Sequence, residues 1–203
     1  MITYLFENPF VFLIGLIGLV IAISIHEFSH AYVADRLGDP TPRLMGRVTL
    51  NPLAHLDPIG TIAILLVGFG WGKPVQFDPF NLANPRRDAA LISFAGPLSN
   101  ILLALILAIL ARVFPSPYTF VLPSLIYINC MLALFNLIPV HPLDGFKIVS
   151  GLLSQEQAEK WQELERYGPI LLIALLLPLI GGTSLVSVVL SPVLDFVLGL
   201  LLG

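Results

Sequence analysis

Long, uninterrupted apolar segments constrain this chain more than any other feature. Several of them exceed the roughly 17 to 20 residues that a helix needs to cross a membrane. Only 11% of the residues are charged, against about 25% in soluble domains. The sequence therefore predicts an all-α polytopic membrane protein in contact with lipid, with residues 1–203 forming one integral-membrane domain. The apolar segments cover residues 9–25, 89–111, 120–140, 170–180 and 185–202.

A shorter apolar segment, residues 59–72, differs from these spans. Its 14 residues include four glycines, which suits a segment that enters the membrane and returns better than a full crossing. The alternating runs RVTLN (47–51) and KPVQF (73–77) flank it and have the pattern of short strands. We therefore expect about five transmembrane helices, one short re-entrant segment and a small β-hairpin.

The positions of the basic residues predict how the spans are oriented. If the first span runs inward, Arg112 lies outside, and the rest of the ten lysines and arginines lie on the cytoplasmic side. The inner ends of the first and third spans then face the cytoplasm. The net charge of −3 and the absence of a basic cluster argue against a nucleic-acid partner.

The most specific motif is HEFSH at residues 26–30, inside the helix predicted from the first apolar segment. His26 and His30 are one helical turn apart, so both imidazoles project from one face and can bind one metal ion, with Glu27 beside them. Two neutral imidazoles suit zinc. Ionisable groups within a span point to function because they are costly to bury there. The alternative is a pair of histidines that satisfy each other in a helix bundle.

A catalytic zinc ion takes three protein ligands and leaves one position open for water. His55, Asp57, His141 and Asp144 are candidates for the third ligand. We expect Asp144, because it follows the third span at a depth and on a side that match the inner end of the first span. A carboxylate also balances the charge of the site. His141 is the main alternative, and His55 or Asp57 could instead mark the capped start of the re-entrant segment.

Together these residues predict a hydrolase with one catalytic zinc ion. Zinc would activate a water molecule and polarise a carbonyl group, while Glu27 would accept a proton from the water and deliver it to the leaving amine. A membrane metal transporter and a non-catalytic membrane adaptor are the alternatives. A transporter leaves Glu27 without a role, and an adaptor does not need the complete set of His26, Glu27, His30 and Asp144.

The order of HEFSH, FAGPLSN (94–100) and FNLIPVHPLDG (135–145) resembles the site-2 protease family of intramembrane zinc metalloproteases, and the likeness covers nearly the whole chain. The resemblance implies transmembrane proteins as substrates and a prokaryotic cytoplasmic membrane, with the active site toward the cytoplasm. It implies that Asn100 helps to hold the substrate strand or the developing oxyanion. It also implies that zinc is bound by His26, His30 and Asp144, with Glu27 as general acid and base.

Four further features of the sequence carry expectations. The run at 73–77 could pair with an unwound substrate by edge addition. Asn136 and Pro139 are expected to end the third span so that the chain can turn toward the metal. His141 stands where members of the family often have proline. Asp195, alone in the last span, is assigned no function.

Overall fold

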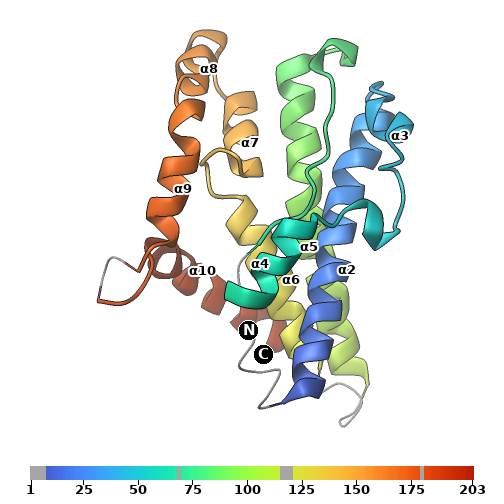
Figure 1. Cartoon of the computed structure of the whole chain (residues 1–203), viewed down its shortest axis with the longest axis vertical. Coiled ribbons are helices and arrows are strands. Elements are labelled where there is room, and N and C mark those ends of the chain that lie inside the picture. The colour runs from blue at the N-terminus through green and yellow to red at the C-terminus, as the bar shows by residue number, and fades with distance from the viewer. Residues whose placement is uncertain (1–7, 68–69, 115–120, 179–180) are drawn as a thin grey trace.

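The computed structural model describes residues 8–67, 70–114, 121–178 and 181–203, and within these ranges the chain is built from helices (Figure 1). Helices α2 and α5 run along the length of the molecule, and α8 lies at the end opposite to the start of α2. Short 3-10 helices interrupt the connections. The elements are α2 (Pro9–Arg36), α3 (Thr41–Leu44), η1 (Pro52–Ala54), α4 (Pro58–Val67), η2 (Pro79–Asn81), α5 (Pro85–Val113), α6 (Leu122–Asn136), α7 (Asp144–Leu152), α8 (Gln155–Gln162), η3 (Glu165–Tyr167), α9 (Gly168–Leu176) and α10 (Leu185–Leu202).

Helix α2 carries the HEFSH motif, and both of its ends have a local cause. Asn8 caps the start by accepting a hydrogen bond from the backbone N–H of Val11 at 3.2 Å. Pro9 occupies the first turn, where its missing N–H costs little. Gly38 follows the end of the helix with a φ of 108°, a conformation that favours glycine. The 28 residues of α2 are enough to cross a bilayer and extend beyond it.

Three of the described helices, α2, α5 and α10, are long and apolar enough to cross a membrane. Helix α6 has 15 residues and a length of about 22 Å, shorter than the roughly 30 Å hydrocarbon core. Helix α9 ends at Leu176, because Leu177 precedes Pro178 and has an extended backbone. The expectation of about five spanning helices is therefore corrected to three within the described residues. Residues 120, 179 and 180 of the predicted spans lie outside these residues.

Helices α2, α5 and α6 form the centre of the molecule, and α5 runs antiparallel to the other two (Figure 1). Ala104 and Ala108 of α5 belong to a buried cluster with Ile126 and Cys130 of α6 and Leu194 of α10. Small residues on α5 let the helix backbones approach closely, which is how helices pack in a membrane. Cys130 is a buried member of this cluster, with 3% of it exposed.

The chain between residues 56 and 72 returns to the level at which it starts. Helix α4 occupies its first part, and an antiparallel bridge joins Leu56 to Gly72. The backbone N–H of Lys73 donates to the carbonyl oxygen of His55 at 2.7 Å, which extends this junction. The two ends of the segment are therefore held together, and its re-entrant path in the membrane stays a prediction. Residues 68 and 69 of the predicted segment lie outside the described residues.

The predicted β-hairpin is wrong for the described residues, because residues 47–51 and 73–77 form no strand there. The guanidinium of Arg47 donates to the backbone carbonyl of Lys73, a group that a β-ladder would use. Pro74 has no N–H to donate, which weakens any ladder at this position. Residues 73–77 therefore form an extended segment held by side chains.

Candidate metal centre and active site

Three side chains from distant parts of the sequence converge at one point. His26 and His30 lie one turn apart on α2, and their ring centroids are 4.6 Å apart. Asp144, the first residue of α7, places Oδ2 3.1 Å from Nε2 of His26 and 3.2 Å from Nε2 of His30. A tetrahedral zinc ion with bonds of about 2.0 to 2.1 Å holds its ligand atoms about 3.3 to 3.4 Å apart. The three atoms are therefore spaced to bind one metal ion.

Gly96 of α5 leaves the space in front of the two imidazoles open. A Cβ atom at this position would lie 2.4 Å from Nε2 of His30 and 2.6 Å from Nε2 of His26. Any side chain at position 96 would therefore occupy the space in front of the two Nε2 atoms. Helix α5 thus approaches α2 closely at Gly96.

The turn between α6 and α7 brings Asp144 back to α2. Helix α6 ends at Asn136 and α7 begins at Asp144, which confirms the predicted end of the third span near Asn136 and Pro139. Gly145 allows the turn to be tight, because a Cβ atom there would lie 2.3 Å from the carbonyl oxygen of Leu137. The carboxylate thereby reaches the histidines of a helix more than a hundred residues earlier.

Each histidine is oriented by a hydrogen bond from its other ring nitrogen. Nδ1–H of His30 donates to the backbone carbonyl of Ile92 at 2.7 Å, and Nδ1–H of His26 donates to Oδ1 of Asn100 at 2.7 Å. A carbonyl oxygen cannot donate, so both partners keep the proton on Nδ1 and leave Nε2 free to bind a metal ion. Such outer hydrogen bonds fix the ring and raise its basicity as a ligand.

Asn100 lies behind His26 and is fully buried. Its amide donates to the carbonyl oxygen of Ala22 at 3.1 Å and to Oδ1 of Asn129 at 3.0 Å. The side chain does not line the cavity in front of the metal-facing atoms. The structure thus places Asn100 against His26, a candidate ligand. The contact with substrate that the family resemblance implies stays a prediction.

Glu27 lines the same cavity as the three candidate ligands, and the cavity has a volume of about 670 Å³. Its Oε2 accepts a hydrogen bond from the backbone N–H of Val75 at 3.0 Å. The guanidinium of Arg47 lies 3.9 Å from the same oxygen. Glu27 is therefore a positioned carboxylate beside the metal-facing atoms, which is the arrangement that a general base needs.

Arg47 is a residue of this site that the sequence analysis does not single out. Only 3% of it is exposed, and its Nε has no hydrogen-bond partner among the described residues. Burial lowers the pKa of the guanidinium, while the negative charge of Glu27 raises it. A buried cation is costly unless it is paired. Arg47 lies beside the Glu27 carboxylate and donates to the extended segment, so it links the two. No local pattern distinguishes it from surface arginines, because its burial depends on tertiary contacts.

The other candidate residues lie apart from the three ligands. Nδ1 of His141 is 3.6 Å from Oε1 of Glu165 on η3. His55 is fully buried, and its Nε2 donates to a backbone carbonyl at 2.7 Å. Asp57 accepts a backbone N–H at 2.8 Å at the start of α4, as predicted for a cap. Asp195 is exposed on α10.

The fold and the site together define a membrane-embedded, metal-dependent hydrolase with a His-Glu-x-x-His helix. The model of peptidase family M50 matches residues 14–120 and 112–178 of the chain. The chain belongs to this family, the site-2 protease family, and is an integral membrane zinc metalloprotease.

Similar proteins come from bacteria and archaea. YwhC of Bacillus subtilis (strain 168) is 38% identical over 190 residues, which cover 88% of this chain and 84% of YwhC. Rip2 of Mycobacterium tuberculosis (strain H37Rv) is 28% identical over 183 residues, which cover 85% of this chain and 70% of Rip2. Zinc metalloprotease MJ0392 of Methanocaldococcus jannaschii is 27% identical over 157 residues, 74% of this chain and 37% of that protein. No solved structure gives a significant match.

Proposed function

We propose that residues 1–203 form one catalytic domain that hydrolyses peptide bonds within or near transmembrane segments of membrane-protein substrates. In this proposal His26, His30 and Asp144 bind one zinc ion, and Glu27 is the general acid and base. The observation that carries the proposal is the convergence of these four side chains on one cavity beside a helix long enough to span the membrane.

A zinc ion at this site would supply Lewis acidity, which would polarise the substrate carbonyl and lower the pKa of a water molecule so that Glu27 can take its proton. His26 and His30 present Nε2 to the ion because their Nδ1 protons are held by acceptors behind them. Glu27 accepts a proton from the attacking water and gives it to the leaving nitrogen. The N–H of Val75 holds the Glu27 carboxylate in place before the first transfer.

A transmembrane substrate must unwind before it can be cut, because a helical peptide bond is covered and hydrogen-bonded within its helix. The extended segment 73–77 offers a place to bind the unwound strand. One of its edges is already used, since Lys73 and Val75 donate inward to His55 and Glu27. In an extended chain, successive residues point their N–H groups to opposite edges, so Gln76 presents its N–H at the free edge, and no hydrogen bond to described residues uses it.

The basic residues support a cytoplasmic active site. Arg36 lies in the last turn of α2, just beyond the HEFSH motif, and Arg86 and Arg87 lie in the first turn of α5 at the same end of the molecule (Figure 1). Arg112 lies in the last turn of α5, at the opposite end. Under the positive-inside rule, the end with the many basic residues faces the cytoplasm of a prokaryotic cell.

The proposal is tested by removing and restoring the metal. The purified protein in liposomes is stripped with a chelator and is then assayed for cleavage of a model single-span substrate with and without added zinc. We expect cleavage to be lost on stripping and restored by about one zinc ion per chain. A protein that binds zinc but cuts no member of a broad substrate panel would contradict the proposal and favour a transporter or an adaptor.

A further inference from the structure

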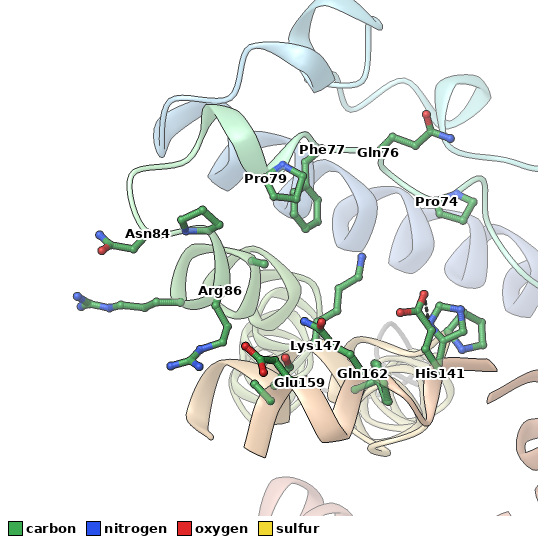
Figure 2. A pocket seen from close by; sticks show the side chains of 18 of the residues that line it. Pro74, Gln76, Phe77, Pro79, Asn84, Arg86, His141, Lys147, Glu159 and Gln162 are labelled. Carbon is green, nitrogen blue, oxygen red and sulfur yellow. Dashed lines mark ion pairs between the residues drawn. The ribbon is translucent and has the colours of Figure 1, made fainter. Parts of the chain in front are cut away.

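A second cavity, of about 1220 Å³, adjoins the cavity of the metal centre (Figure 2). It lies between the extended segment that leads to η2, the start of α5, and helices α7 and α8. The two cavities share five lining residues, so they lie next to each other. The shared residues are Pro74, Val75, Phe77, Pro142 and Lys147.

The cations of this second cavity are not paired with carboxylates in the described part of the chain. Arg86, Arg87 and Lys147 line it, and none of them has a carboxylate within 4.0 Å among the described residues. The carboxylates of the cavity do have neighbours. Nε2 of Gln155 donates to Glu159 at 3.3 Å, and Glu165 lies 3.6 Å from His141. The second cavity can therefore bind a negatively charged group.

Lys147 stands at the junction of the two cavities. It lies on α7 three residues after Asp144, so the two side chains share one face of the helix. Its ammonium group lies 4.8 Å from the centre of the Phe77 ring, a cation–π contact that holds it over the extended segment. Figure 2 shows the Lys147 side chain reaching into the space below Phe77. A chain that leaves the metal centre along the extended segment must pass this ammonium group.

We propose that the second cavity receives the polar flank of the substrate, where the substrate leaves the membrane, and that Lys147 binds an acidic side chain of that flank. This inference rests on the proposed function. An extended chain advances about 3.3 to 3.6 Å per residue, and residues three apart on a helix lie about 5 to 6 Å apart. The acidic residue therefore lies at least about two positions from the cut bond, and Arg86 and Arg87 meet acidic residues farther along.

The experiment measures kcat/KM for three substrates that differ only at one position, at least about two residues from the cut, with glutamate, glutamine or lysine there. The wild type should cut the glutamate substrate about two to five times better than the lysine substrate, as expected for a partly exposed ion pair. Lys147→Glu should reverse that order. Lys160→Glu makes the same charge change on α8 outside the cavity, where Lys160 pairs with Glu156, and it should keep the order of the wild type.

Zinc content is measured in each variant to confirm that the site is folded. If Lys147→Glu loses zinc, Lys147→Gln replaces it in the comparison and should remove the preference for the glutamate substrate. Equal cleavage of the three substrates by the wild type, or an unchanged order in the cavity variant, would overturn this inference alone. A zinc-loaded wild type that cuts no substrate would instead overturn the proposed function, and this inference with it.

Discussion

At the residue scale, the two histidines of the metal centre are oriented in different ways. The acceptor behind His30 is a backbone carbonyl, which no substitution removes. The acceptor behind His26 is the side chain of Asn100, which itself makes two further buried hydrogen bonds. The orientation of His26 therefore depends on one replaceable amide, and this difference can be tested by mutation.

Asn100→Ala should weaken zinc binding by about 10- to 100-fold, the usual effect of losing an outer partner of a metal ligand. Asn100→Asp keeps an acceptor for Nδ1 of His26 and should recover part of the affinity. Competition with a zinc chelator of known affinity measures both variants. Normal zinc affinity in Asn100→Ala, combined with weaker substrate binding, would show that the amide acts on the substrate and not on His26.

Most of the metal centre can be predicted from the sequence because its chemistry is local. His26, Glu27 and His30 share one helix, and the position of Asp144 follows from the order of the spans. The partner of His26 could not be assigned in this way, because Asn100 lies 74 residues later in the sequence and its direction depends on how α5 packs on α2. The burial of Arg47 depends in the same way on tertiary contacts.

At the element scale, the short alternating runs were misleading. The run at 73–77 is extended as its pattern suggests, but its backbone groups bond to Arg47 and Glu27 instead of a second strand. An alternating pattern of apolar and polar residues predicts an extended backbone, but it does not predict which groups that backbone bonds to. The re-entrant segment stays a prediction from its length and its glycines, and the bridge between Leu56 and Gly72 is consistent with it.

Gln76→Pro tests whether the free edge of segment 73–77 binds substrate. Proline removes the N–H of Gln76 while leaving the inward bonds of its neighbours. We expect kcat/KM to fall about tenfold or more, because a backbone hydrogen bond to the substrate is lost. Gln76→Ala keeps the N–H and is the control. Equal rates for the two variants would indicate that the segment only closes the cavity.

Asp39 joins the chain around η2, just after segment 73–77, to the end of α2. It is fully buried and accepts hydrogen bonds from the hydroxyl of Thr41 at 2.6 Å, the N–H of Asp78 at 2.7 Å and the amide of Asn81 at 2.8 Å. Burial alone would raise the pKa of Asp39, but these bonds lower it below its usual value of 3.8. The charged form of Asp39 therefore stabilises the folded protein.

Asp39→Asn should lower the Tm at neutral pH by about 5 °C, the effect of weakening hydrogen bonds to a buried charge. A carboxylate with a lowered pKa binds fewer protons when folded, so its contribution is full above its usual pKa and is lost as the pH falls through the lowered value. The difference in Tm between the wild type and Asp39→Asn should thus shrink below about pH 4. Tryptophan fluorescence during heating in detergent measures both Tm values. A Tm difference that does not change with pH would contradict the stabilising role of charged Asp39.

At the scale of the whole molecule, the positions of the basic residues predict that the metal centre faces the cytoplasm. In a Cys130→Ala background, Lys160→Cys on α8 should react with an impermeant maleimide only from the cytoplasmic face. Arg112→Cys should react only from the outer face, because it lies at the other end of α5. Labelling with the faces exchanged would mean that the active site opens away from the cytoplasm.

The most direct test of the account compares the wild type with Glu27→Gln. Glutamine keeps the shape of the side chain and is not one of the three metal ligands, so both proteins should bind about one zinc ion. Only the wild type should cut a model transmembrane substrate in liposomes, because the amide cannot accept and return a proton. If Glu27→Gln binds zinc and cuts at the rate of the wild type, Glu27 is not the general base and the account is wrong.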